Sequence, residues 1–401
     1  MKNLEENQKE LELKFICKLK SGTNLTSEQI ESSGSYPVYG GNGVRGYYEN
    51  YNLDGKNILV GRQGALCGNV HITNDKLWAT EHAWAVKLQD NLRTDLEYLY
   101  YLLIGLNLNQ YASDSAAQPG LSANVIHNLH VPLISYDEQV DIAQYLKCMD
   151  RKIDNAIKRH ITSIDNIKEY IHSLISDAIL KGLREDKKKE TDSMWFPNIP
   201  TGWKIEKIKY IFSINKRIAG KEGHTVLSIT QRGIIPKDLS KNEGQIAQSY
   251  ANYQIVHEGD FAMNHMDLLT GWVDISQYEG VTSPDYRVFT LNDTKNNNPK
   301  YFLYIMQMCY FNRIFYNMGA GVSELGRWRL QATPFREFKV PVPPIDEQNE
   351  IVKFLDEKCA KADEAIKRQE MAIEKLEEYR KSIIYHAVTG KIDCRKEKGN
   401  E

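Results

Sequence analysis

The chain has 401 residues, of which 41% are hydrophobic and 26% charged, and its formal net charge is −2. This length suits two or three domains. The sequence has no long apolar run and no apolar leader, which argues against a membrane span and a secretory signal. It has no CxxC pair, which argues against a zinc ribbon and for free thiols in the cytoplasm. Residues 1–130 carry 11 Lys and Arg against 14 Asp and Glu, and residues 195–340 carry 17 against 13, so neither segment has the strongly basic character of an autonomous DNA binder.

The first segment, residues 1–130, is predicted to be a mixed α/β domain. Runs rich in aromatic and β-branched residues alternate with glycine turns at residues 36–48, 57–72 and 78–88, a pattern typical of strands. A helix is expected next, over the run LEYLYYLLIGLNL.

A long helix is predicted for residues 131–183. Val131 and Pro132 block an earlier start, and Asp137 and Glu138 place acids on the first turn, where the positive end of the helix favours them. Apolar residues then recur every three or four positions, with a stutter near Met149. Gly182 is the expected cap, and the charged residues 184–194 are expected to be a solvated linker.

The rest of the chain repeats this plan. Residues 195–339 contain four strand-like runs (TVLSIT, QIVHEGDFAMNHM, GWVDISQY and SPDYRVFTL) and then one helical run, PKYFLYIMQMCYFNRIFY. A second long helix is predicted for residues 340–392, followed by a flexible tail at residues 393–401.

The two long helices are copies of one another. Residues 131–178 align with residues 340–387 without gaps at an offset of 209, with 19 identities in 48 positions. A helix of about 45 residues spans roughly 65 Å, which is too long to be buried in one small domain. We therefore predict an α+β protein in which two mixed α/β domains are separated by two long helices that form an antiparallel coiled coil with pseudo-two-fold symmetry.

Several motifs carry a resemblance to a known family. They are PxxxxDEQ at the start of each long helix, Trp195 with Ile199-Pro200-x-Gly202-Trp203, Tyr39-Gly40-Gly41 with Gly61-Arg62-x-Gly64-x-x-x-Gly68, and Asn264-x-Met266-Asp267 with Gly271 and Ser283-Pro284-x-Tyr286. Over essentially its full length the chain resembles the specificity subunit of a type I restriction-modification system, although the first domain lacks the IPxGW opening. The resemblance implies two target-recognition domains that each read half of a bipartite asymmetric DNA site.

The same resemblance implies partners. Two modification (methyltransferase) subunits would dock on the long helices, which also set the spacing between the two readers, and restriction subunits would join them to cut the DNA. S-adenosylmethionine, ATP and Mg²⁺ are then expected on the partner subunits, and neither a cofactor nor a metal on this chain. The expected docking residues are Asp137, Glu138 and Gln139 in the first helix and Asp346, Glu347 and Gln348 in the second.

Residues that read DNA are predicted from base chemistry. Arg pairs with guanine, and Asn or Gln with adenine, in the major groove, whereas phosphate contacts carry no sequence information. The candidates in the first domain are Asn42, Arg45, Arg62, Gln63 and His82. The candidates in the second domain are Gln231, Arg232, Asn264, Asp267, Arg287, Arg327 and Arg329.

Three alternatives stay open at this point. A stand-alone enzyme is disfavoured because the glycine run at Gly61–Gly68 lacks nucleotide-binding spacing, Asp293-Thr294-Lys295 has no companion acid, and residues 264–267 lack the prolines of a methyltransferase motif. A coiled-coil scaffold without DNA specificity is less favoured. The recognition subunit of a related type II system that cuts at a fixed distance is compatible with the sequence.

Overall fold

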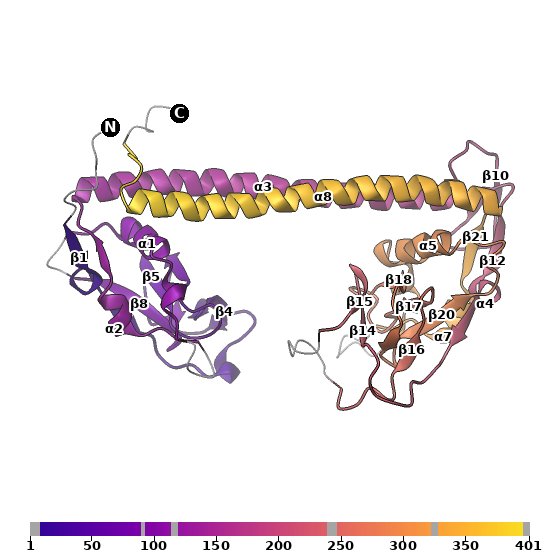
Figure 1. Cartoon of the computed structure of the whole chain (residues 1–401), viewed down its shortest axis with the longest axis horizontal. Helices are drawn as coiled ribbons and strands as arrows, with labels where there is room; N and C mark the ends of the chain where they lie inside the picture. Colours follow the sequence, from indigo (N-terminus) through magenta and orange to yellow (C-terminus); the bar gives the residue numbers. More distant parts are fainter. Residues whose placement is uncertain (1–8, 90–92, 114–118, 239–246, 322–327, 396–401) are drawn as a thin grey trace. The chain divides into compact units, whose positions relative to one another are not determined.

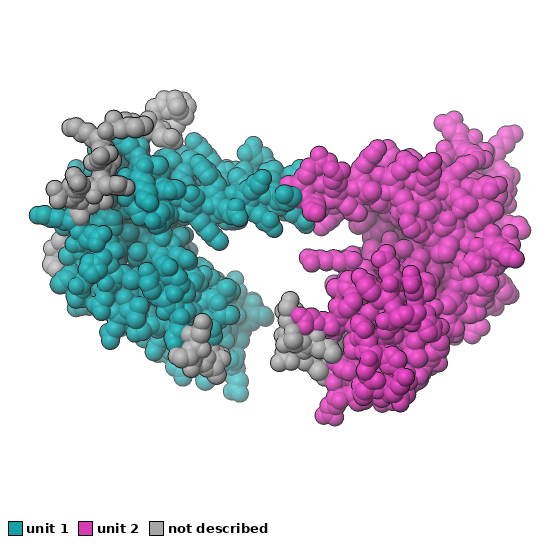
Figure 2. Space-filling model, in the orientation of Figure 1, with its two compact units in different colours: residues 1–161, 369–401 teal, residues 162–368 magenta. Residues whose placement is uncertain are grey.

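The structure is a computed structural model that describes residues 9–89, 93–113, 119–238, 247–321 and 328–395. It divides into two compact units (Figure 2), residues 1–161 with 369–401 and residues 162–368. Two long helices, α3 (Tyr136–Lys181) and α8 (Ile345–Val388), contribute one half each to both units. None of the helices in the described ranges is long and apolar enough to cross a membrane.

The centre of unit 1 is an antiparallel four-stranded sheet. Its strands, in spatial order, are β2 (Cys17–Ser21), β8 (Ala83–Leu88), β5 (Asn57–Gly61) and β6 (Val70–Thr73). Numbered along the chain, this order is 1-4-2-3. Every residue of β5 is buried because its alternate side chains enter two cores, Ile58 and Val60 on the helix side and Leu59 on the other side.

Smaller elements complete unit 1. They are β1 (Glu10–Glu12) paired with β9 (His130–Pro132), the sheet formed by β4 (Gly43–Tyr48), β3 (Tyr36–Gly40) and β7 (Trp78–Ala79), and the helices α1 (Leu96–Gly105) and α2 (Ala123–His127). Helix α1 lies between the sheet and the long helices (Figure 1), and its Leu99 and Leu102 are buried in the same core as Leu146 of α3 and Ile384 of α8.

Unit 2 has the same sheet topology. Its strands, in spatial order, are β13 (Phe212–Asn215), β20 (Arg287–Leu291), β17 (Phe261–Met263) and β18 (Val273–Ile275), which is again 1-4-2-3 along the chain. Phe261 and Phe289 face α5 (Pro299–Phe311) and the long helices in one large core. The predicted helical run is broken at Arg313, which has a φ of 59°, and continues as α6 (Ile314–Asn317).

Further pairs of strands surround this sheet. They are β10 (Lys188–Glu190) with β11 (Asn198–Pro200), β12 (Lys204–Lys207) with β21 (Lys339–Val342), β14 (Leu227–Thr230) with β15 (Gly233–Pro236), and β16 (Gln254–Val256) with β19 (Gly280–Thr282). The short helices are α4 (Ile208–Ile211) and α7 (Ala332–Glu337). The segment expected to be only a solvated linker therefore contains an exposed strand, β10, that pairs with the IPxGW region.

The two long helices pack antiparallel in each unit. In unit 1 the first half of α3 lies beside the second half of α8, where Arg380 forms an ion pair with Asp154. In unit 2 the second half of α3 lies beside the first half of α8, where Ile175 and Ile179 share a core with Ile351 and Leu355. Helix α3 begins at Tyr136, after strand β9, and ends at Lys181, and Gly182 follows with a φ of 72°. The predicted α+β fold, with two mixed domains joined by repeated long helices, is confirmed.

Candidate nucleic-acid interface

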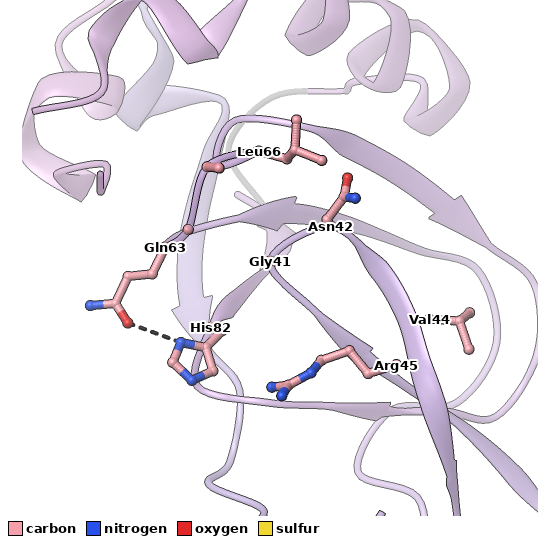
Figure 3. Close-up of a pocket in the computed structure, with 9 residues that line it drawn as sticks. Gly41, Asn42, Val44, Arg45, Gln63, Leu66 and His82 are labelled. Carbon is pink, nitrogen blue, oxygen red and sulfur yellow. Dashed lines mark hydrogen bonds between the residues drawn. The ribbon is translucent and has the colours of Figure 1, made fainter. Parts of the chain in front are cut away.

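A pocket in unit 1 brings together four of the five residues predicted to read DNA there. Its volume is about 440 Å³, and it lies between the β3–β4 hairpin and the ends of β5 and β8 (Figure 3). Polar side chains of Asn42, Arg45, Gln63 and His82 line it together with the apolar Val44 and Leu66. Val44 and Leu66 are 53% and 48% exposed, so the pocket rim offers apolar as well as polar contacts.

Gln63 and His82 are placed by the central sheet. Strands β5 and β8 pair up to Gly61 and Ala83, and the backbone N–H of Arg62 then donates to the carbonyl of His82 at 2.8 Å. Gln63 follows directly and forms an isolated bridge with Gly120 on its other side. The two side chains therefore lie next to each other at the sheet edge, and His82 Nδ1 is 3.0 Å from Gln63 Oε1.

Glycines allow the hairpin turn to approach this sheet edge. A Cβ on Gly61 would collide with the carbonyl oxygen of Gly41, and a Cβ on Gly41 would collide with that of Gln63. Both positions therefore need glycine for the close approach of two backbones. In the paired glycine motifs of the first domain, Gly41 and Gly61 therefore have a structural role.

Arg62 does not line the pocket. Its guanidinium lies 5.8 Å from the centre of the Trp84 ring, and the side chain is half-buried. It stays a candidate for DNA contact only at the margin of the pocket.

In unit 2 two candidates are exposed on one turn. Gln231 and Arg232 form the tight turn between β14 and β15, and Gln231 Nε2 donates to the carbonyl of Thr270 at 3.4 Å. This bond links the hairpin to the loop that follows β17. The Arg232 side chain is exposed, so it stays a candidate for DNA contact.

Polar side chains of the loop after β17 form hydrogen bonds within that loop. Asp267 accepts hydrogen bonds from the backbone N–H groups of Leu269 and Thr270 at 2.9 and 3.0 Å and from the Thr270 hydroxyl, and Asn264 Oδ1 accepts from Met266 N at 3.3 Å. Although burial raises the pKa of Asp267, these bonds outweigh it and lower that pKa. Both side chains therefore have a turn-forming role, and their contact with bases stays a prediction.

The prediction that Arg287 reads DNA is wrong. It is only 5% exposed, its guanidinium lies 4.5 Å from the centre of the Phe335 ring, and its Nη2 donates to the carbonyl of Leu330 at 3.0 Å. Burial lowers its pKa to about 10. The side chain points into the core and fixes the segment at Leu330, so it is not available to DNA.

The two other arginine candidates of unit 2 are Arg327 and Arg329. Arg329 is exposed, and its backbone pairs with Ala320. Arg327 lies outside the described residues. His265 is beside Arg287 and is mostly buried, and burial, with the charge of Arg287, lowers its pKa to about 3. It is therefore neutral near pH 7.

The repeated Asp-Glu-Gln triplets differ from the predicted docking surface. Asp137 and Asp346 are exposed, whereas Glu347 is 7% exposed, and the two glutamines, Gln139 and Gln348, are 7% and 0% exposed. The half-buried Glu138 accepts hydrogen bonds from the backbone N–H of Ser135 at 3.1 Å and from its hydroxyl at 2.9 Å. The assignment of these glutamines and of Glu347 to an exposed docking face is wrong, because their side chains are buried.

The glutamines instead join each domain to its long helix. Gln139 Oε1 accepts from the backbone N–H of Asp95, the N-cap of α1, at 2.9 Å. Gln348 Oε1 accepts from the N–H of Asn298, the N-cap of α5, at 2.8 Å. The sequence carried a signal for this burial, because Gln139 stands three residues before Ile142 on the apolar face of the helix.

The two domains have the same sheet topology, and each packs against paired halves of the repeated helices. Each also has polar loops at the edge of its sheet. These features define a duplicated recognition protein. Among the described residues, no group of three or more His, Cys, Asp and Glu is arranged to hold a metal ion. The family model for the type I restriction modification DNA specificity domain matches residues 5–163 and 200–375, and the chain therefore belongs to this family.

Curated relatives agree with this membership. The chain is 38% identical over 157 residues to the EcoprrI type I restriction enzyme specificity subunit of Escherichia coli, a match that covers 38% of this chain and 37% of that relative. It is 21% identical over 419 residues to the EcoDI specificity subunit of Escherichia coli, which covers 96% and 89% of the two chains.

A solved structure shares the fold. A chain from a study of complex assembly and conformational transition in the type I restriction-modification system aligns with a TM-score of 0.62 and 11% identity. The alignment covers 96% of this chain and 98% of that chain.

Proposed function

We propose that this chain is the sequence-specific DNA-recognition subunit of a type I restriction-modification complex, and that each domain reads one half of a bipartite asymmetric site. The observation that carries the proposal is the family match across both domains, which share one sheet topology. Their exposed polar loops differ, with Asn42, Arg45 and Gln63 in one and Gln231 and Arg232 in the other. Because the reading groups differ, the two halves of the site should differ as well.

The surface of the long helices supports two equivalent docking sites. Identities between the repeats at buried positions, such as Ile175 and Ile384, follow from packing alone. Tyr170 and its counterpart Tyr379 are 58% and 48% exposed, so packing does not require their identity. A tyrosine kept at the same exposed position in both copies is consistent with contact to two copies of one partner.

Each unit carries a complete set of these exposed repeated residues because the helices are antiparallel. Unit 1 has Lys158-Arg159 from α3 and Glu378-Tyr379 with Ser382 from α8. Unit 2 has their counterparts. These are Lys367-Arg368 from α8 and Glu169-Tyr170 with Ser173 from α3. We therefore propose one modification subunit on each unit.

Chemistry is assigned to the partners in this proposal. Methyl transfer with S-adenosylmethionine belongs to the two modification subunits, and ATP- and Mg²⁺-dependent cleavage belongs to restriction subunits that join them. This chain would be non-catalytic, would hold no cofactor of its own, and would work in the cytoplasm, where the host DNA lies.

One experiment tests the proposal directly. The chain, co-purified with its modification subunit, is incubated with a random DNA library and S-adenosylmethionine, and the methylated adenines are mapped. We expect two short defined blocks separated by a fixed unread gap, and no methylation by the chain alone. Turnover by the chain alone, or methylation without sequence preference, would contradict the proposal.

A further inference from the structure

We infer that the pocket of unit 1 reads the major-groove edge of a guanine. This rests on the proposed function and adds the identity of one base to it. Hydrogen bonds on the protein side determine which end of each polar side chain is left for a ligand.

The orientation of Asn42 follows from a chain of amides that ends at a backbone carbonyl. Asn109 Nδ2 donates to the carbonyl of Cys67 at 2.6 Å, and it makes a longer contact of 3.5 Å with Asn69 Oδ1. The other end of that amide, Asn69 Nδ2, donates to Asn42 Oδ1 at 2.6 Å. Because a carbonyl can only accept, the order of donors and acceptors is set along the chain. The Asn42 amide therefore presents its NH₂ group, a donor, to the pocket.

A second chain orients Gln63. Glu81 Oε1 lies 3.1 Å from His82 Nε2, and Gln63 Oε1 lies 3.0 Å from His82 Nδ1 (Figure 3). The amide oxygen of Gln63 can only accept, so His82 Nδ1 donates to it. Gln63 is thus held by its oxygen, and its NH₂ group faces away from His82 as a donor.

Arg45 supplies donors only. Its side-chain stem lies over Gly40, where a Cβ would collide with the Arg45 Cδ atom, and the guanidinium lines the pocket beside His82 (Figure 3). No Asp or Glu is among the residues that line the pocket. Among the lining residues, the side chains that can donate to a ligand are therefore the amides of Asn42 and Gln63 and the guanidinium of Arg45.

Only one base presents two acceptors and no donor in the major groove. Guanine offers N7 and O6, whereas adenine offers N7 with the N6 donor, cytosine offers the N4 donor, and thymine offers O4 beside a methyl group. Donors from three side chains match the two acceptors of guanine, whereas thymine offers them only one acceptor, and adenine or cytosine leaves a donor facing a donor. A phosphate is also an acceptor, but a phosphate contact would act equally on all sequences.

The test uses the complex of this chain with its modification subunit and selection from a random DNA library. Asn42→Asp and Gln63→Glu each keep the side-chain shape and the bond on the protein side, but they replace the outward donor with an acceptor. We expect each variant to lower the preference for guanine at one position of one block by roughly 5- to 150-fold, in favour of cytosine, whose N4 donates. Asn50→Asp is the matched control, because it adds the same charge to an exposed residue outside the pocket, and it should change nothing.

The outcomes separate the inference from the proposed function. The other block, read by unit 2, should stay unchanged in both variants, which also shows that the complex is folded. If the wild-type complex selects a site but both variants keep the same bases, the inference is wrong. A uniform loss of binding across all sequences would identify a phosphate contact and would also overturn it. A wild-type complex that selects no sequence would overturn the proposed function together with the inference.

Discussion

At the residue scale, Gln139 joins a domain to a helix through two backbone groups. It accepts from the N–H of Asp95 and donates to the carbonyl of Ile134 at 3.2 Å. We predict that Gln139→Ala destabilises the start of α1 by about 2–3 kcal/mol, because it leaves buried polar groups without partners. Hydrogen exchange at the Asp95 amide should become faster. Gln144→Ala, on an exposed position of the same helix, should change stability by less than about 0.5 kcal/mol, and equal effects of the two variants would contradict the role of Gln139.

His265 makes unit 2 sensitive to acid. Its pKa in the folded protein is about 3, well below the ordinary value of 6.5, because it is buried beside Arg287. The unfolded chain therefore binds a proton that the folded chain does not, and stability falls as the pH drops below 6.5 towards 3. The expected loss from this residue is roughly 1.4 kcal/mol per pH unit in that range.

Urea unfolding of the wild type and of His265→Gln at pH 7 and pH 4.5 measures this contribution. The variant should lose less stability on acidification than the wild type, even if it is less stable at pH 7. Burial also lowers the pKa of His71, His127 and His172, so the difference between the two proteins is the informative quantity. Parallel losses in the two proteins would rule out His265 as the cause.

Side-chain direction decides which predicted site residues can meet DNA. Base chemistry favours residue types, and Arg287 is a candidate because arginine pairs with guanine. Strand periodicity places Arg287 on the same face as Phe289, which is the core face, and this signal was available in the sequence. The turn-forming bonds of Asp267, by contrast, depend on loop geometry that periodicity does not describe.

At the scale of elements, the long helices could be predicted because one period persists over more than forty residues and occurs twice. The sheets could not. The strands of the two four-stranded sheets have three to six residues, and β2 and β8 pair Cys17 with Leu88 across most of the domain. Local patterns locate such strands but do not say which ones pair. The shared 1-4-2-3 topology of the two domains was therefore visible only in the structure.

The two exposed tyrosines repeated on the long helices can be tested one at a time as docking residues. We predict that Tyr379→Ala weakens binding of the modification subunit on unit 1 by about 30-fold, as for an aromatic residue at the centre of an interface, and that Tyr170→Ala does the same on unit 2. Native mass spectrometry should then show complexes with one modification subunit for each single variant and none for the double variant.

The matched control for these variants is Tyr210→Ala. Tyr210 is 65% exposed in the short helix α4 and is not part of the repeated helices. It should leave two modification subunits bound. Full occupancy in the double variant would show that the repeated tyrosines serve another purpose.

At the scale of the whole molecule, duplication gives two domains with one topology and two helices with one surface. A single kind of partner can then recognise both units, while the reading loops diverge. The repeated parts would carry assembly and spacing, and the diverged parts would carry sequence recognition. This division predicts that spacing and base identity can be changed independently.

Lengthening both helices tests that independence. Both helices pass from one unit to the other between residues 161 and 162 and between residues 368 and 369. Insertion of seven helical residues at each place adds about 10 Å, or roughly three base pairs of duplex. We expect the unread gap in the methylated site to grow by about this amount while both blocks keep their bases. Seven residues inserted between Glu185 and Asp186, which are exposed and outside the helices, should leave the gap as it was. An unchanged gap in the helix variant would mean that the helices do not set the spacing.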